Sequence, residues 1–157
     1  MPNGSADDFD FQVGDWDVSH RRLVGRLVNS SVWEEFPGAC CMRKVLGGHG
    51  NIEVNFIDLP AGAYRALALR SFDPETRQWA IWWLDARRPH GLDTPVIGGF
   101  ENGVGAFYAD DMLDGRPIRV RFFWLGADSD TPRWEQAFSP DGGVTWETNW
   151  IMQFKRA

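Results

Sequence analysis

The sequence has few of the residues that disulfide-rich or metal-binding domains require. Its 157 residues include two cysteines, Cys40 and Cys41, which are adjacent. Neighbouring strand residues point to opposite faces, so a disulfide between them would be strained, and we expect one buried and one near-surface thiol. The three histidines, at positions 20, 49 and 90, are far apart and show no H-x-H or H-E-x-x-H spacing. We therefore predict a reduced protein with no metal site.

Long apolar runs and an excess of basic residues are also missing. Residues 1–8 are polar and acidic, which is unlike a signal peptide, and no stretch is apolar enough for a membrane-spanning helix. The formal net charge is −6 and the pI is about 5.0. Nucleic acids and anionic membranes are bound through basic faces, so we expect neither as a partner. These observations predict a soluble, cytoplasmic protein.

No convincing helical period runs through the chain, whereas period-2 alternation between turn residues recurs from residue 13 to the end. This pattern is typical of an all-β protein. The expected strands are residues 14–24, 27–37, 39–46, 51–58, 63–73, 78–86, 96–101, 104–112, 117–126, 132–139 and 145–155, of which one or two could be short or merged. Asp7-Asp8 followed by Phe9, Phe11 and Val13 is compatible with one short helical turn in the segment 1–12.

Short connections between successive strands predict antiparallel neighbours, and therefore a meander. Closing a meander of about ten strands into a barrel removes its two edges, which would otherwise invite aggregation. We predict one barrel domain over residues 1–157. A two-sheet sandwich is the alternative.

Hairpin counting predicts which side chains face the interior. Across the turn near Pro74, we expect Ala68, Arg70 and Phe72 to meet Trp79, Ile81 and Trp83 on one face. Across Asp114-Gly115, Asp110 pairs with Arg119 and Tyr108 with Arg121, so the opposite face, with Phe122 and Trp124, is inward. A turn at Gly25-Arg26 would place Trp33 and Glu35 on the same face as Trp16, His20 and Arg22.

Around Asp141, pairing Phe138 with Trp146 aligns Gln136 with Thr148 and Trp134 with Trp150, and turns Glu135, Glu147 and Asn149 outward. The predicted interior is thus aromatic with a few polar groups, which is the usual composition of a small-molecule pocket. Its candidate ligand-binding residues are His20, Trp33, Glu35, Arg70, Trp83, Phe122, Trp124, Trp134, Gln136, Thr148 and Trp150.

Gly14-Asp15-Trp16 resembles the G-x-W signature of the lipocalin and calycin barrels. That resemblance implies that Trp16 closes one end of the barrel and that a basic side chain of the last strand, Lys155 or Arg156, packs across it. The chain also resembles the DUF1579-like bacterial family of unknown function, in residues 10–16 and 133–139, which implies a fold and no catalytic residue. Nitrobindins are haem barrels with a similar opening, but their axial histidine lies late in the chain and nothing follows His90 here, so we predict no cofactor.

Three interpretations of function remain open at this point. The first is a binding module that encloses a small, largely apolar or aromatic molecule, in a cavity of roughly 300–1,000 Å³ among the tryptophans. The second is a cofactor-free lyase or isomerase with His20 and Glu35 as proton carriers and Arg22 or Arg70 beside an oxyanion. A Cys40 or Cys41 nucleophile paired with His20 is a variant of it. The third is a structural domain with a filled core.

The run 79–84, Trp-Ala-Ile-Trp-Trp-Leu, is apolar on both faces of its strand. One face can line the interior, and the other needs a cover because large exposed apolar patches are uncommon on monomers. The loop 87–95 is one candidate cover. We favour a homodimer with Trp82 and Leu84 near its centre, since twofold dimers are the commonest oligomers.

Overall fold

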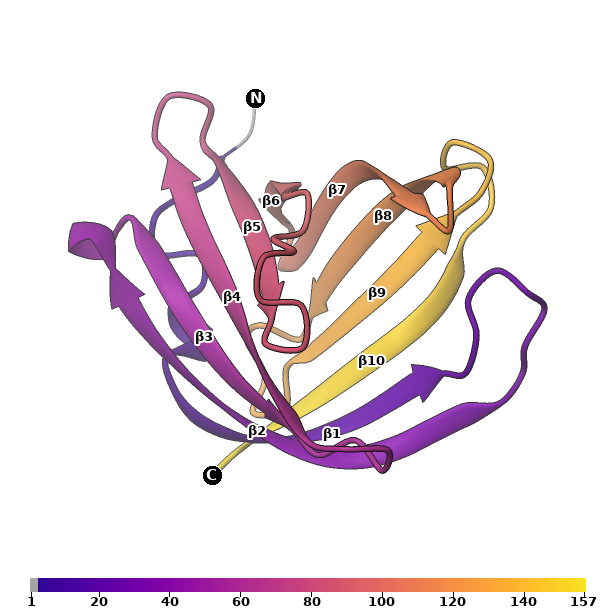
Figure 1. Ribbon diagram of the computed structural model, residues 1–157. Coiled ribbons are helices and arrows are strands. Elements are labelled where there is room, and N and C mark those ends of the chain that lie inside the picture. Colours follow the sequence, from indigo (N-terminus) through magenta and orange to yellow (C-terminus); the bar gives the residue numbers. More distant parts are fainter. Residues whose placement is uncertain (1–2) are drawn as a thin grey trace.

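The protein is a closed antiparallel barrel of ten strands in the order β1-β10-β9-β8-β7-β6-β5-β4-β3-β2, seen in a computed structural model that describes residues 3–157 (Figure 1). The strands are β1 Gly14–Leu23, β2 Trp33–Val45, β3 Gly50–Ile57, β4 Tyr64–Asp73, β5 Gln78–Asp85, β6 Val96–Glu101, β7 Val104–Leu113, β8 Arg116–Leu125, β9 Arg133–Ser139 and β10 Glu147–Arg156. Two 3-10 helices, η1 Asp10–Gln12 and η2 Leu46–Gly48, complete the secondary structure of these residues. The predicted meander barrel is confirmed, and a sandwich is excluded.

The largest difference from the predicted strands lies in β2. Residues 27–37 and 39–46 were expected as two strands, but Trp33–Val45 is one continuous strand and residues 24–32 form a connection. Gly38 lies inside this strand, where an added Cβ would come within 2.7 Å of His20 Nε2. Gly38 therefore does not end the strand. Its missing side chain leaves room for the His20 ring.

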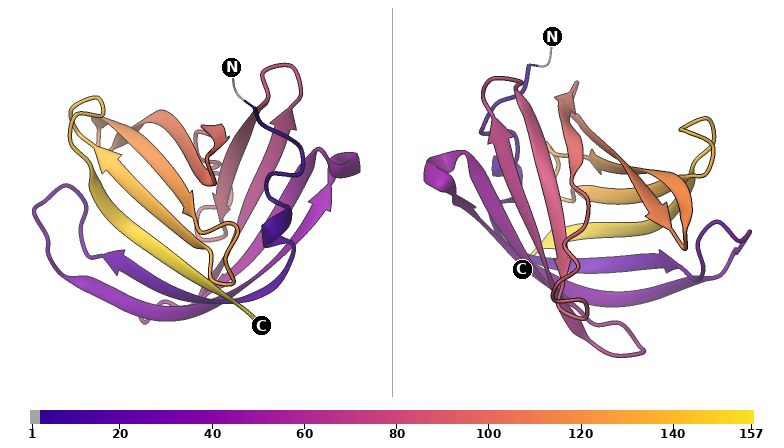
Figure 2. Two further views of the ribbon diagram at one scale, coloured as in Figure 1. Left: turned by 180° about the vertical axis from the view of Figure 1, so that it is seen from behind. Right: turned by 45° about the horizontal axis from the view of Figure 1, so that its top comes forward.

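One end of the barrel is closed by the N-terminal segment, which runs down one side of the barrel in the view from behind before the chain enters β1 (Figure 2). Phe9 is buried in the interior, with its ring centroid 5.0 Å from that of Trp79 and 5.1 Å from that of Phe100. The Trp16 indole donates a hydrogen bond to the Gln12 carbonyl at 2.9 Å. This end of the interior is therefore filled with side chains.

Arg156 packs across Trp16 at the same end of the barrel, as the resemblance to the lipocalin G-x-W signature implies. Its guanidinium lies 3.8 Å from the centroid of the Trp16 ring. It also donates hydrogen bonds to the carbonyls of Val13 and Phe11. The last strand thus ties the N-terminal segment to the barrel by cation–π and charge-assisted contacts.

The barrel wall is weakest between β5 and β6, where the ladder has three residue pairs, Trp79 with Gly98, Ala80 with Ile97 and Ile81 with Val96. Beyond them the connection 86–95 leaves the wall, and the Asp93 amide donates to the Trp83 carbonyl at 3.0 Å. This connection lines the interior at the end opposite Trp16. Among residues 3–157, no helix is long and apolar enough to cross a membrane.

Polar and apolar faces of β3 are inverted relative to a simple amphipathic strand. Asn51, Glu53 and Asn55 are buried inside the barrel, whereas Val54 on the other face is 43% exposed. The interior side chains meet Arg70 of β4. Glu53 forms an ion pair with it, and Asn51 Oδ1 accepts a hydrogen bond from it at 3.0 Å. The barrel therefore contains a buried polar network next to its filled end.

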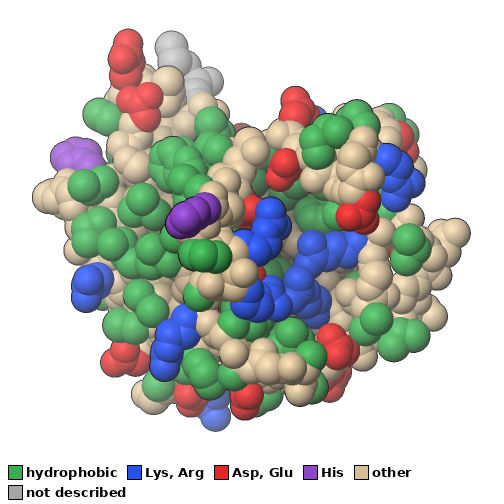
Figure 3. Space-filling model, in the orientation of Figure 1, with side chains coloured by type: hydrophobic (Ala, Val, Ile, Leu, Met, Phe, Trp, Pro, Cys, Tyr) green, Lys and Arg blue, Asp and Glu red, His purple; other side chains and the backbone are tan. Residues whose placement is uncertain are grey.

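The outer face of β3, β4 and β5 is apolar as a consequence. Cross-strand pairing places Ile52, Leu69 and Trp82 in one row and Val54, Leu67 and Leu84 in the next. We call these six residues the outer apolar face. Figure 3 shows hydrophobic side chains gathered over these strands.

Candidate functional site

A cavity of about 250 Å³ occupies the half of the interior opposite Trp16, and it opens at the barrel mouth. One wall is a series of aromatic rings that pack edge to face. The ring centroid of Trp150 lies 5.7 Å from that of Trp83 and 5.4 Å from that of Trp134, and Trp134 lies 4.9 Å from Phe122. Of the tryptophans predicted to surround a cavity, Trp83, Trp134 and Trp150 line this one, and its volume lies below the predicted range of roughly 300–1,000 Å³.

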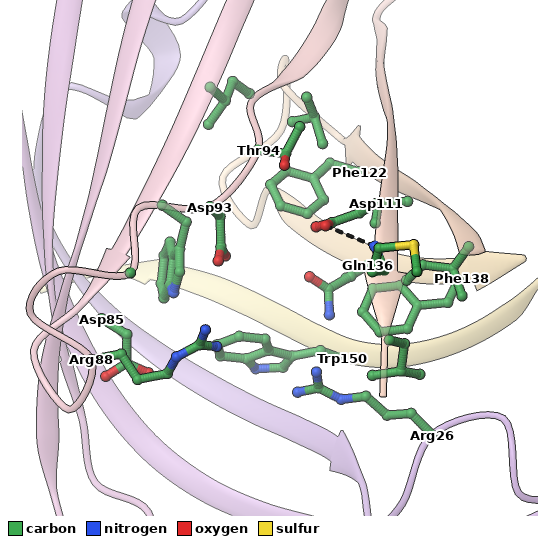
Figure 4. A pocket seen from close by; sticks show the side chains of 18 of the residues that line it. Arg26, Asp85, Arg88, Asp93, Thr94, Asp111, Phe122, Gln136, Phe138 and Trp150 are labelled. Carbon is green, nitrogen blue, oxygen red and sulfur yellow. Dashed lines mark hydrogen bonds between the residues drawn. The ribbon is translucent and has the colours of Figure 1, made fainter. Parts of the chain in front are cut away.

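Small apolar side chains and one amide complete the cavity wall. Ile81, Val96, Ile118 and Val120 line it from β5, β6 and β8. Gln136 reaches it from β9 and is held by a hydrogen bond from its Nε2 to Asn149 Oδ1 at 2.7 Å. Figure 4 shows Gln136, Asp93, Trp150 and Arg26 around the same space.

The rim of the cavity is charged. Four arginines, Arg22, Arg26, Arg87 and Arg88, and three aspartates, Asp85, Asp93 and Asp111, are among the lining residues. Figure 3 shows Lys and Arg side chains gathered around the hollow on this face of the molecule. The combination is an apolar chamber under a polar, predominantly basic rim.

Most of the predicted interior residues do point inward, although they do not share one cavity. Trp83, Phe122, Trp134, Gln136 and Trp150 line the main cavity together with Arg22. Arg70 and Trp124 lie deeper, around a second space of about 20 Å³ that suits no more than a water molecule. Their predicted role in ligand binding stays a prediction.

The predicted inward orientation of Trp33 and Glu35 is wrong. Glu35 pairs with Arg21 on the outer face, where its carboxylate lies 3.3 Å from the Arg21 guanidinium. Trp33 also lies beside Arg21, with 5.0 Å between guanidinium and ring centroid. The expected turn at Gly25-Arg26 is in fact the connection 24–32, and shifting a strand by an odd number of residues moves all its side chains to the opposite face.

The predicted positions of Thr148 and Asn149 are wrong as well. The β9–β10 register changes between Thr148 and Trp150, where a β-bulge inserts a residue. Thr148 pairs with Ala137 and so lies on the outer face, while Asn149 is fully buried against Gln136. The bulge is what brings Trp150 opposite Gln136 and into the cavity wall.

His20 is a buried core residue. Its Nδ1 accepts a hydrogen bond from the Trp150 indole at 3.0 Å, and its ring stacks on Phe36 at 4.9 Å between centroids. Burial, and then the charge of Arg22, lower its pKa from 6.5 to about 4. His20 is therefore a neutral imidazole at neutral pH, and it holds the Trp150 indole in place by accepting its hydrogen bond.

Sequence reasoning missed the Glu53–Arg70 network. The Arg70 guanidinium lies 4.6 Å from the centroid of the Phe9 ring, and Asn55 Nδ2 donates to Glu53 Oε1 at 3.0 Å. The sequence did contain an indication of this network. Asn51, Glu53 and Asn55 alternate on one face of their strand, and the neighbouring strand carries Arg70, which was predicted to point inward. Polar alternation normally indicates a solvated face, which is why that signal was not used.

The two cysteines lie as predicted, Cys40 buried and Cys41 exposed. Burial raises the pKa of the Cys40 thiol, which is a property of an inert structural cysteine. Cys41 lies on the outer face of β2, across from Asp15. Neither thiol lines the cavity.

No protein-family model matches the chain, and no curated protein is significantly similar to it. The closed antiparallel barrel is compatible with a lipocalin-like fold. The resemblance to the DUF1579-like family stays a prediction.

Proposed function

We propose that this barrel is a binding module that encloses a small, largely apolar or aromatic molecule at its open end. The observation that carries the proposal is the cavity itself, with aromatic rings on one wall, a charged rim and a filled floor. Pockets for small molecules combine an apolar lining with a few placed polar groups. Lipocalin-like or calycin-like ancestry, and membership of the DUF1579-like family, belong to the same proposal.

The alternative function, acid–base catalysis, is not supported by the positions of the residues that the sequence suggested for it. General catalysis requires titratable groups within reach of one ligand atom. His20 is not among the cavity-lining residues, and Glu35 lies on the outer face, so Arg22 alone of that set reaches the cavity. The third interpretation, a structural domain with a filled core, fits the end of the barrel around Phe9 but not the mouth, which contains the cavity. Binding is therefore the function that the geometry supports best.

N-phenyl-1-naphthylamine, a neutral aromatic dye, tests the proposal. We expect saturable one-to-one binding, seen as a rise in dye fluorescence and a fall in tryptophan fluorescence, because Trp83, Trp134 and Trp150 form the cavity wall. Val120→Phe adds a ring inside the cavity and should weaken binding by about tenfold or more, which corresponds to ~1.4 kcal/mol.

Val104→Phe is the matched control, since Val104 lies on β7 and is 39% exposed. It should leave dye affinity unchanged. Equal affinity of wild type and Val120→Phe, or no saturable binding at all, would refute the proposed cavity function.

We also propose a homodimer that is formed through the outer apolar face. The other candidate cover, the connection 86–95, lines the cavity with Arg87, Arg88, Gly91, Asp93 and Thr94. Trp82→Glu places a charge at its centre and should convert a dimer to a monomer in sedimentation velocity without loss of the folded spectrum. Val144→Glu, at a position that is 82% exposed in the β9–β10 connection, is the control and should remain dimeric. A wild-type protein that sediments as a monomer at high concentration contradicts the proposal.

A further inference from the structure

Two guanidinium groups at the cavity rim form no ion pair at contact distance. Arg22 of β1 and Arg26 of the β1–β2 connection both line the cavity, and neither forms an ion pair with any residue in 3–157. Arg22 Nη1 is 3.4 Å from the Tyr64 hydroxyl, and its guanidinium lies 4.8 Å from the centroid of the Trp150 ring. Its contacts are thus aromatic and neutral.

Arg87, on the same rim, shows the contrast. It binds Asp85 with two guanidinium nitrogens, Nε at 3.1 Å and Nη2 at 2.6 Å from the carboxylate oxygens, and with its backbone amide at 2.8 Å. Asp85 therefore forms its ion pair with Arg87, and the nearby charge of Arg22 adds only a longer-range attraction.

Arg22 and Arg26 are close enough to repel each other. Burial first, and then the charge of Arg22, lower the pKa of Arg26 to about 10. Arg26 stays protonated at neutral pH, so the rim holds two positive charges in a partly desolvated place. A bound anion would relieve this repulsion.

The position of Arg26 is held by the neighbouring strands. The Leu27 amide donates a hydrogen bond to Glu147 Oε1 at 2.8 Å, which ties the connection to β10. The Arg26 guanidinium lies 5.4 Å from the centroid of the Phe138 ring. Figure 4 shows Arg26 extending beneath the cavity toward Trp150. The Arg26 guanidinium is therefore held at the mouth of the barrel before a ligand binds.

We infer that Arg22 and Arg26 bind the anionic head group of the ligand, a carboxylate, while its aromatic body lies against Trp83, Trp134 and Trp150. This inference rests on the proposed binding function. Guanidinium forks match carboxylate oxygens geometrically, and charge-assisted hydrogen bonds are stronger than neutral ones.

The aspartates of the same rim favour a single negative charge on the ligand. Asp93 and Asp111 line the cavity there. Burial, followed by the charge of Asp111, raises the pKa of Asp93, while the charges of Arg88 and Arg26 act in the other direction. A carboxylate suits this rim better than a doubly charged phosphate monoester.

A matched pair of dyes separates the head-group site from the cavity. N-phenyl-1-naphthylamine is neutral, and 8-anilino-1-naphthalenesulfonate adds one negative charge to the same ring system. Arg26→Gln should lower the affinity of the sulfonate dye about tenfold and change that of the neutral dye less than twofold. Arg43→Gln removes the same charge from the exposed outer face of β2 and should change neither.

Competition with ring-matched compounds identifies the head group. Against the sulfonate dye, 1-naphthoate should compete more strongly than 1-naphthamide and than 1-naphthyl phosphate on the wild type. The advantage of 1-naphthoate over 1-naphthamide should disappear in Arg26→Gln and be partly restored in Arg26→Lys.

Two results would overturn the inference while leaving the cavity proposal intact. One is an equal effect of Arg26→Gln on both dyes. The other is equal competition by 1-naphthoate and 1-naphthamide while the neutral dye still binds and is excluded by Val120→Phe. A wild type that binds neither dye would instead refute the cavity function, so the two failures are distinguishable.

Discussion

Arg70→Met is expected to destabilise the barrel by about 3–5 kcal/mol, since it leaves a buried carboxylate without its partner. Arg70 and Glu53 are each 3% exposed, Asn51 accepts a hydrogen bond from Arg70, and Asn55 donates one to Glu53. Removing the guanidinium also removes its contact with Phe9 at the closed end of the barrel. The loss would appear as a lower urea midpoint in far-UV circular dichroism.

A more exposed pair provides the control. Arg133 and Glu135 lie 3.1 Å apart with side chains that are 41% and 20% exposed. Arg133→Met should cost less than about 1 kcal/mol because water screens such pairs. The double variant Glu53→Leu/Arg70→Met removes both buried charges and should be more stable than Arg70→Met alone. If Arg70→Met costs no more than Arg133→Met, the buried network does not stabilise the fold in the way we describe.

Acidification from pH 7 to pH 4 is expected to cost the wild type about 3 kcal/mol through His20 alone. Its pKa is lowered from 6.5 to about 4 in the folded protein. Between these two values the unfolded chain binds more protons than the native protein, so this contribution to stability is fully present above pH 6.5. It is lost as the pH falls toward 4.

His20→Gln isolates this contribution, because the amide oxygen can still accept a hydrogen bond from Trp150 and does not titrate. The difference in unfolding free energy between wild type and variant should change by about 3 kcal/mol between pH 7 and pH 4. His49→Gln, at an exposed position, should show no such change. Parallel pH profiles for wild type and His20→Gln would contradict a neutral, buried His20.

The strand registers that sequence counting predicted correctly are those across short turns. Asp114 and Gly115 connect β7 to β8 with φ of 49° and 79°, and the predicted pairing of Asp110 with Arg119 is present. Arg70 likewise pairs with Ile81 across the short β4–β5 connection, residues 74–77. A short turn restricts the register of the strands it joins, so local chemistry is sufficient there.

Where the connection is long or the ladder is irregular, the same counting misplaced side chains. Trp33 and Glu35 follow the connection 24–32, and Thr148 precedes the bulge at Asn149. Loop length does not specify a register, and an inserted residue exchanges the two faces of a strand. Of the eleven candidate ligand-binding residues, Trp33, Glu35 and Thr148 lie on the outer face for this reason.

The sequence by itself determined the all-β class, the meander and the aromatic character of the interior, because alternation and tight turns are local properties. The resemblance to the lipocalin opening implied a basic residue across Trp16 and left Lys155 and Arg156 open, and the structure shows Arg156 there. Only the tertiary structure decided that β3 turns its polar face inward toward Arg70. It alone decided that Phe9 fills one end of the barrel while the other stays hollow. It also brought Arg22 and Arg26 together without an ion pair at contact distance in residues 3–157. These features depend on which side chains meet across distant strands, and that follows from closure of the barrel rather than from any local pattern.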